Sequence, residues 1–140
     1  MCIRDSGNPD GLRRQRYAGY VGTYANVTGA EVHDDGEIYA AAMWRLRELW
    51  LKSKRDNDSL FDHFVDGMNY TPSTPAYEQM RNGMLDAIAA TAGADAVERC
   101  ALVWKAFAQF GIGDGASGVV SRRGAVTITP STATRADCSH

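Results

Sequence analysis

The segment from Glu37 to Leu51 places apolar side chains at the spacing of an α-helix. The apolar set consists of Ile38, Tyr39, Ala42, Met43, Leu46, Leu49 and Trp50. Charged residues lie between them, so one face of the helix is apolar and the other polar. A stripe of this kind has to be buried against another element. The chain is therefore expected to fold around this helix, with further helices as its packing partners.

Three further segments carry the same helical pattern. A short one covers 59–68, and a longer one begins with Thr74 as N-cap and Pro75 at the first helical position, and ends at Gly93. A fourth covers 95–111. Proline is tolerated in the first turn of a helix, and glycine commonly follows the last one. The sequence thus predicts an all-α fold, a bundle of about four helices with irregular segments at both ends.

The two ends of the chain do not continue this pattern. Residues 1–10 include MCIRDS, which looks like translated sequencing adapter, and we expect them to be adapter-derived or disordered. The natural protein is then expected to extend further upstream. The helical lobe is expected to span 11–118, beginning with a Gly- and Tyr-rich loop. Residues 119–140 are polar and Thr/Ser-rich, which indicates a tail or linker; only AVTIT resembles a strand.

Composition argues against two classes of partner. The formal net charge is -2, and the 15 Lys and Arg residues are scattered apart from the stretches RRQR and SRR, so the basic surface of a nucleic-acid-binding protein is missing. No apolar run approaches the roughly 20 residues that cross a bilayer, and the N-terminus lacks the apolar core of a secretory signal. We therefore expect neither a nucleic acid nor a membrane as a partner.

The three cysteines give no pattern of their own. Cys2, Cys100 and Cys138 are odd in number and lack the spacing of metal ligands, so no disulfide framework can be read from them. Cys100 lies among apolar residues of the fourth predicted helix, where a buried thiol is usually inert. We expect Cys100 to serve core packing, and we place Cys138 in the polar tail.

The candidate chemistry centres on one histidine. His33 and Glu37 are four residues apart, which on a continuous helix puts both on one face as possible metal ligands. Two ligands are too few, and the chain has no H-E-x-x-H, C-x-x-C or G-x-S-x-G motif. Asp34 and Asp35 are best explained as helix-capping acids, and His63 as a structural residue of the short helix. No metal site is expected within this chain.

Three blocks of the sequence resemble the fungalysin-like zinc metallopeptidases, in the family's order. EVHDDGEIYAAAMWRL is similar to V-H-x-x-G-E-[VI]-[WY]-A, and ERCALVWKAFAQFGIGDGAS is similar to C-x-x-x-W-K-x-F-A-x-x-G-[LI]-G-x-x-A. Between them, DGMNYTPSTPAYEQMRNGMLDAI resembles the family's D-G-M/L-x-x-x-P-x-x-P-x-[FY]-x-x-x-R-[DN]-A/G-[IM]-L. The resemblance covers roughly Tyr17 to Gly118, and the helical plan resembles the C-terminal lobe of thermolysin-type peptidases.

The resemblance implies a C-terminal fragment of a secreted zinc metalloendopeptidase, which hydrolyses internal peptide bonds of proteins or peptides with metal-activated water. The family binds zinc with an H-E-x-x-H helix and a later glutamate, and neither is found in this sequence. Zinc would therefore be bound by a missing N-terminal catalytic lobe of the same polypeptide. This chain would form one wall of the substrate cleft and be inactive alone. An extracellular location rests on the family likeness.

The resemblance also assigns roles to individual residues. His33 is similar to the family histidine that donates a hydrogen bond to the oxyanion formed when water attacks the peptide carbonyl. Relatives of thermolysin type place an orienting aspartate five residues earlier, where this chain has Thr28. Glu31 and Asp35 are the candidate replacements, and the choice between them stays open. Glu37 matches the family's G-E position and could either cap the helix, a structural role that is favoured, or line the cleft.

Two further positions match residues of the family. Arg81 corresponds to a family arginine, which implies a structural hydrogen-bond donor. Ser73 stands where fungal relatives carry the cysteine of a P-C-N-P stretch, so no disulfide from that position to Cys100 is expected.

The alternative to a peptidase lobe is a non-catalytic helical interaction module that keeps the packing of the lobe. His33 would then be a surface or capping residue. A self-contained hydrolase would need a nucleophile or a metal site that the sequence does not show. The polypeptide upstream of this chain distinguishes the first two hypotheses, because only the peptidase requires an H-E-x-x-H helix there.

Overall fold

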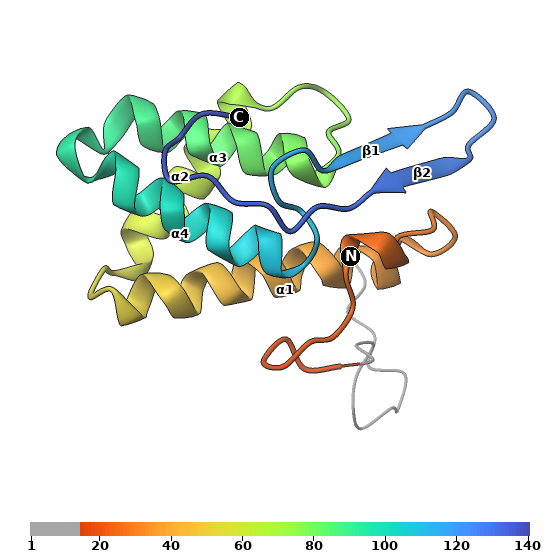
Figure 1. The fold of residues 1–140 in the computed structure, drawn as a ribbon, viewed down its shortest axis with the longest axis horizontal. Helices are drawn as coiled ribbons and strands as arrows, with labels where there is room; N and C mark the ends of the chain where they lie inside the picture. Colours follow the sequence, from red (N-terminus) through yellow and green to blue (C-terminus); the bar gives the residue numbers. More distant parts are fainter. Residues whose placement is uncertain (1–14) are drawn as a thin grey trace.

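The computed structural model describes residues 15–140. In this part of the chain, four α-helices form a bundle from which a β-hairpin projects (Figure 1). The helices are α1 (Val32–Lys52), α2 (Asn57–Gly67), α3 (Tyr77–Thr91) and α4 (Ala96–Gln109), and the strands are β1 (Ser117–Val120) and β2 (Val126–Thr129). Short 3-10 turns occur at η1 (Tyr24–Asn26), η2 (Met68–Tyr70) and η3 (Gly93–Asp95). The all-α bundle predicted from the sequence is confirmed, with a small hairpin added to it.

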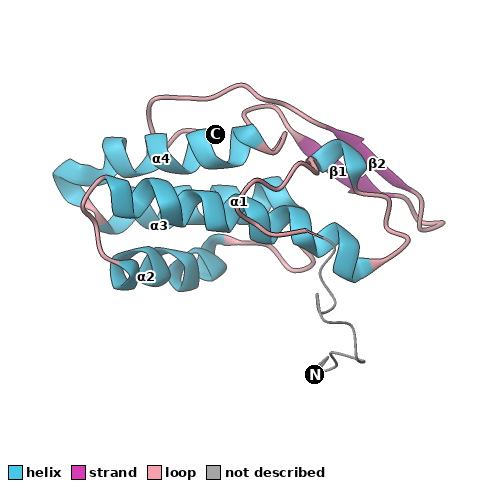
Figure 2. Cartoon of the chain, turned by 90° about the horizontal axis from the view of Figure 1, so that it is seen from below, coloured by secondary structure: helices cyan, strands magenta, loops and turns pink. Residues whose placement is uncertain are grey.

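The core lies where α1 and α3 pack against α4, while α2 covers the other side of α3 (Figure 2). The largest fully buried side chains are Trp50, Trp104, Tyr24, Phe107, Leu46, Met84, Leu85 and Ile88. Burying one large apolar side chain contributes about 1.5–3 kcal/mol. Apart from Tyr24 of η1, these residues lie in three of the predicted helices, so the helical period of 3.6 residues correctly located the segments that form the core.

Helix α1 begins at Val32, five residues before Glu37, where the segment predicted from the apolar stripe begins. The Glu31 carboxylate accepts hydrogen bonds from the backbone N–H groups of His33, at 3.0 Å, and Asp34, at 2.9 Å. A side-chain acceptor at this position satisfies N–H groups that have no partner within the helix. Capping by Glu31 therefore extends the helix, and His33 lies inside its first turn.

The predicted start of the third helix was wrong. Thr74 has a φ of 54°, in the left-handed region, whereas an N-cap residue is normally extended. Pro75 consequently lies in the preceding loop, and α3 begins at Tyr77 after Ala76 as N-cap. The Gln79 side chain accepts a hydrogen bond from the Ala76 N–H at 2.9 Å, which closes the start of the helix.

Helices α2 and α3 approach each other at two glycines. A Cβ atom on Gly67 would lie 3.0 Å from the backbone nitrogen of Met84, and a Cβ on Gly83 would meet the carbonyl oxygen of Gly67 and the hydroxyl of Thr71. Contacts this short leave no room for a side chain at the crossing. The two glycines therefore permit a backbone-to-backbone approach that brings α2 against the core.

The chain after α4 returns along the bundle. Strands β1 and β2 pair antiparallel from Ser117 opposite Thr129 to Val120 opposite Val126, so the AVTIT segment does form a strand. Residues 130–140, here named the C-terminal strap, then run back along α4 (Figures 1 and 2). The strap is joined to the turn after α4 by isolated bridges from Ile112 to Ser131 and from Asp114 to Ala133. The predicted boundary between the helical lobe, which ends at residue 118, and the tail, which begins at residue 119, stays a prediction.

The expectation of an inert, unpaired Cys100 was wrong. Cys100 of α4 forms a disulfide with Cys138 of the strap, across a sequence separation of 38 residues and a Cα–Cα distance of 5.2 Å. Cys100 is fully buried, as its apolar neighbours indicated. The pairing could not be predicted because it depends on the return of the strap along α4, which no local pattern encodes. Cys2 lies outside the described residues.

Removing the disulfide should destabilise the fold. Cys138→Ser is expected to lower the free energy of unfolding by about 2–4 kcal/mol, because the cross-link limits the conformations of the unfolded chain. Urea titration of both proteins without reductant measures the difference. In the presence of reductant the two proteins should unfold at nearly the same urea concentration, which serves as the control. Equal stability without reductant would contradict the assignment.

Candidate functional site at the start of α1

His33 lies in the first turn of α1 with its side chain exposed. The helix that carries it is fixed by the burial of Ile38, Ala41 and Leu46 on its opposite face. A group that assists a reaction has to be held in place by a rigid element before the reaction begins. The first turn of a packed helix provides such a mounting and leaves the ring accessible to a partner outside the bundle.

Two hollows are lined in part by residues of this helix start. A polar hollow of about 530 Å³ is lined by Tyr20, Asn26, Asp34 and Glu37, among others. A second hollow of about 620 Å³, here named the hairpin groove, is lined in part by Val32 of α1, the start of α3 and both strands. Val32 lines the hairpin groove and Asp34 lines the polar hollow, whereas His33, which stands between them in the sequence, is not among the lining residues of either.

The loop before α1 is held by Asp35. Its carboxylate accepts hydrogen bonds from the backbone N–H groups of Thr28, at 3.1 Å, and Gly29, at 2.7 Å. The hydroxyl of Thr28, which stands at the family's aspartate position, accepts a bond from the Ala30 N–H at 3.2 Å. Asp35 thus ties the loop to the helix, as Glu31 caps the helix itself. Either Glu31 or Asp35 is predicted to orient the His33 ring, and the choice between them stays open.

Glu37 lies one turn beyond the helix start and is only 3% exposed. It therefore does not cap α1, and its position is in the wall of the polar hollow. Burial and the neighbouring Glu37 carboxylate, to which the Tyr20 hydroxyl is hydrogen-bonded, raise the pKa of Tyr20. The Tyr20–Glu37 pair connects the irregular N-terminal segment to α1 at this hollow.

Glu78 is a buried polar residue that the sequence did not single out. Its carboxylate, 9% exposed, accepts hydrogen bonds from the Tyr24 hydroxyl at 2.7 Å and from the Gly118 N–H at 2.9 Å. Three segments that are distant in the sequence, η1, α3 and β1, therefore meet at one carboxylate. A glutamate in a first helical turn is favoured by the helix dipole, so its sequence position gave no sign of this role.

The residues around Glu78 are closely packed. Burial and the hydrogen bond to Glu78 raise the pKa of Tyr24 above its usual range. A Cβ atom on Gly118 would meet the Tyr24 hydroxyl, so glycine is required there. The ring of Tyr77 lies 5.4 Å from that of Tyr24 and 5.3 Å from that of Tyr39, and burial raises the pKa of Tyr77 to about 12. These aromatic contacts support the floor of the hairpin groove.

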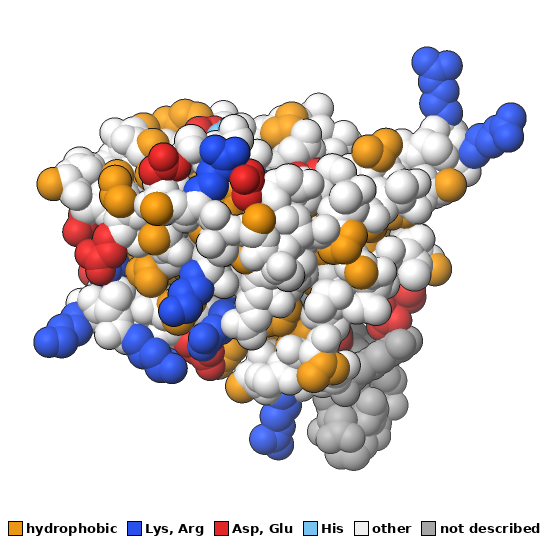
Figure 3. Space-filling view, viewed as in Figure 1, with side chains coloured by type: hydrophobic (Ala, Val, Ile, Leu, Met, Phe, Trp, Pro, Cys, Tyr) orange, Lys and Arg blue, Asp and Glu red, His pale blue; other side chains and the backbone are white. Residues whose placement is uncertain are grey.

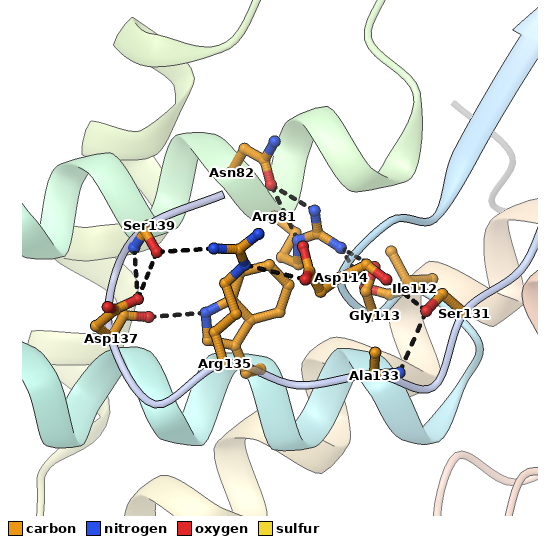
Figure 4. Close-up of polar contacts among 11 residues, drawn as sticks. Arg81, Asn82, Ile112, Gly113, Asp114, Ser131, Ala133, Arg135, Asp137 and Ser139 are labelled. Atoms are coloured by element: carbon orange, nitrogen blue, oxygen red, sulfur yellow. Dashed lines mark hydrogen bonds and ion pairs between the residues drawn. The ribbon is translucent and has the colours of Figure 1, made fainter.

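Arg81 lies on α3, next to the turn that follows α4 (Figure 4). Its Nη1 atom donates hydrogen bonds to the carbonyl oxygens of Ile112 and Gly113, each at 2.6 Å, and its guanidinium lies 4.3 Å from the centre of the Trp104 ring. Burial lowers the pKa of Arg81 to about 10. The arginine, which is 3% exposed, holds the turn after α4 in place from inside the protein.

The turn held by Arg81 also supports the loop that leads to the site. The carbonyl oxygen of Phe110 accepts a hydrogen bond from the Tyr24 N–H at 2.8 Å. Tyr24 is bound at its backbone by this contact and at its hydroxyl by Glu78, so η1 is fixed at its first residue. The position of the helix start thus depends on residues from α3 and from the end of α4.

His63 occupies a structural position in α2. It is 5% exposed, its Nε2 atom lies 2.7 Å from Nη1 of Arg99, and its ring packs edge-on against Trp50. Burial and the positive charge of Arg99 lower the pKa of His63. The imidazole is consequently held neutral, with Nε2 as the acceptor.

The described residues do not assemble a metal centre. Between residues 15 and 140, no three or more histidine, cysteine, aspartate or glutamate side chains are grouped so that they could hold a metal ion. Over the same range, no helix has the length and apolar character needed to cross a membrane. The site at the start of α1 is therefore a set of positioned polar groups around two hollows.

Comparison with known proteins gives these groups a context. The sequence model of the fungalysin metallopeptidases matches residues 5–116. The chain is 29% identical over 147 residues to the extracellular metalloproteinase MEP of Neosartorya fischeri, covering 90% of this chain and 23% of that protein. It is 31% identical over 144 residues to extracellular metalloproteinase 4 of Trichophyton soudanense, covering 84% of this chain and 35% of that protein. No solved structure matches the chain.

These matches define the class of protein, a metallopeptidase, of which this chain corresponds to a part. The chain belongs to the fungalysin metallopeptidase family. It spans between about a quarter and a third of the length of these relatives. The resemblance seen in the three sequence blocks is thereby confirmed.

The junction at Glu78 can be tested by removing one donor. Tyr24→Phe should lower the free energy of unfolding by about 1–3 kcal/mol, because a buried carboxylate oxygen loses its hydrogen bond. Tyr70→Phe is the matched control, since half of that side chain is exposed, and it should change stability by less than about 0.5 kcal/mol. Urea titration measures both. Equal effects of the two variants would contradict the role given to Glu78.

The lowered pKa of His63 predicts a pH dependence. Below the unfolded value of 6.5 the unfolded chain binds a proton that the folded protein resists, so stability should fall as the pH decreases from 6.5 towards the folded pKa. In His63→Gln the fall in stability below pH 6.5 should disappear, whereas His140→Gln should show the same fall as the wild type. Unfolding titrations between neutral pH and pH 5 measure the free energy of unfolding of each protein. Parallel curves for wild type and His63→Gln would show the explanation to be wrong.

Proposed function

We propose that this chain is the C-terminal helical lobe of a secreted zinc metalloendopeptidase that hydrolyses internal peptide bonds of protein or peptide substrates. The observation that carries the proposal is the family match over residues 5–116. The relatives named above are extracellular metalloproteinases, each several times longer than the part matched by this chain. The remainder of such a protein supplies the other wall of the cleft.

The proposal places the metal outside this chain. The side chains described here do not offer a set of three ligands, so zinc would be held by the preceding catalytic lobe. When bound, zinc polarises the substrate carbonyl and activates a water molecule as the nucleophile. The contribution of this chain is to position groups around the reacting bond.

His33 is proposed as the group that stabilises the transition state. An N–H of its ring donates a hydrogen bond to the oxygen that becomes negatively charged as the carbonyl is attacked. Such a donor helps because it is aimed before the charge develops and needs no rearrangement. Its exposed position in the first turn of a packed helix, with Glu31 capping that helix and Asp35 holding the adjacent loop, supports this role.

The two hollows beside His33 support the proposal of a cleft wall. The polar hollow contains Glu37 and Tyr20, and the hairpin groove is mostly apolar. A peptide substrate offers both backbone polar groups and apolar side chains, and the sequence neighbours of the proposed donor, Asp34 and Val32, line surfaces of both kinds. In this arrangement Glu37 serves the wall of the cleft, and Arg81 supports it from behind.

An extracellular location is part of the proposal. Disulfides persist in oxidising environments and are rare in the reducing cytosol. The Cys100–Cys138 bridge and the extracellular relatives agree with secretion.

The test is made in the full-length protein, with this chain joined to its own upstream polypeptide. His33→Ala should lower kcat/KM by roughly 10²–10³-fold, the usual effect of removing one donor to an oxyanion, while the zinc content stays unchanged. His140→Ala is the matched control, because His140 is paired with Asp86 at the C-terminus. Peptide hydrolysis and metal analysis on the same samples give the two readouts.

Two results would contradict the proposal. Loss of zinc in His33→Ala would mean that His33 is a ligand, and an activity equal to that of the His140→Ala control would mean that it has no role in the reaction. An upstream sequence without an H-E-x-x-H helix would instead support the alternative, a non-catalytic interaction module.

A further inference from the structure

The turn of the β-hairpin presents two adjacent arginines to solvent. Arg122 and Arg123 lie between β1 and β2, and every residue from 121 to 125 is exposed. The hairpin projects from the end of the bundle (Figure 1), and Lys or Arg side chains stand out from the surface at its end (Figure 3). A pair of basic residues is thus held at the most prominent point of the described chain.

The hydrogen bonds of this turn are local. The N–H of Ser121 donates to the carbonyl oxygen of Ala125 at 2.8 Å, and the N–H of Gly124 donates to that of Ser121 at 2.9 Å. Each strand has four residues, and a two-stranded hairpin of that length is marginally stable. Val119 and Val120 are 60% and 68% exposed, so the outer part of β1 gains little from burial. Local opening of the turn should therefore be frequent.

The base of the hairpin is held more firmly than its end. The Gly118 N–H is bound to the buried carboxylate of Glu78, and the side chain of Ile128 packs against the core. Opening is therefore confined to the segment beyond these anchors. An exposed end that opens locally on a stable base is the preferred kind of site for limited proteolysis.

We propose that the peptide bonds after Arg122 and Arg123 are a processing site for trypsin-like endopeptidases, which cleave after arginine and lysine. Hydrolysis adds one water across the bond: the C–N bond breaks, the arginine gains a carboxylate, and the following residue gains an amino group. No oxidant or reductant is involved. The product is a two-chain protein whose smaller piece is the segment after the cut, up to His140.

The structure indicates that the two pieces stay together. The smaller piece carries Cys138, which is joined to Cys100 of the larger piece. Its backbone also binds the larger piece, since Gly113 N–H donates to the Ser131 carbonyl at 2.7 Å and the Trp104 side chain donates to the Asp137 carbonyl at 2.8 Å (Figure 4). Cleavage should leave the fold intact until the disulfide is reduced.

Other basic residues in the described part of the chain are less suited to cleavage. Arg81 is buried, and the side chain of Arg55 is 11% exposed and paired with Asp95 and Glu98. Arg135 is paired with Asp114 on the strap. The strongest competitor is Lys54, which is exposed in the turn between α1 and α2. That turn joins two packed helices, so opening it requires more of the structure to unfold.

The test is digestion of the folded chain with limiting trypsin, without reductant, and identification of the products by mass. Any cut at or before Arg16 removes only the first residues and is recognised by the mass of its product. Among sites beyond Arg16, the first cut should follow Arg122 or Arg123. The nicked protein should remain one species on a denaturing gel without reductant and give two pieces with it, and its circular dichroism should match that of the intact chain.

Two variants provide the controls. In the double variant Arg122→Gln, Arg123→Gln, cleavage at sites beyond Arg16 should be slower by about tenfold. Trypsin must then cleave a segment that opens less often than the hairpin turn. Lys54→Gln should be cut at the hairpin at the wild-type rate. A first cut at Lys54 or Arg135 would overturn the proposal, as would loss of the helical signal when the hairpin is cut in the absence of reductant.

Discussion

The packing of α1 against α4 determines where every proposed functional group lies. Trp50 and Leu46 of α1 and Phe107 of α4 are fully buried, and they fix the direction of α1. Glu31 then sets the residue at which the helix starts, through its bonds to the N–H groups of His33 and Asp34. A shift of the helix by one residue would turn His33 by about 100° around the axis. Core packing and capping together therefore decide the direction of the proposed donor.

The helices were predictable because a helix packed against a neighbour needs apolar residues at a period of 3.6, and this period can be recognised in the local sequence. The predictions made from capping patterns were less reliable, since Thr74 adopts a left-handed conformation and Glu31, a residue seldom used as an N-cap, caps α1. Local sequence could not reveal Glu78 or the Cys100–Cys138 bridge. Both depend on chain segments that meet only after the bundle has formed.

His33 was identified as a candidate functional residue from its place in a family motif. Composition and spacing alone showed only a histidine near acidic residues. The structure adds its surroundings: an exposed first turn, a capped helix start and two hollows. The match to the fungalysin family ends at residue 116, and the hairpin and the strap follow it. The strap is nevertheless part of the folded unit, since it covers Trp104 and is joined to α4 by the disulfide.

The central claim is that the ring of His33 faces the oxygen that becomes charged during peptide hydrolysis. The most direct measurement is a crystal structure of the full-length peptidase with a phosphorus-containing inhibitor that mimics the tetrahedral intermediate. The account predicts a ring nitrogen of His33 at about 2.7–3.1 Å from an inhibitor oxygen, the distance of a hydrogen bond to an oxyanion. A His33 ring bound to the metal, or turned away from the inhibitor towards solvent, would contradict it.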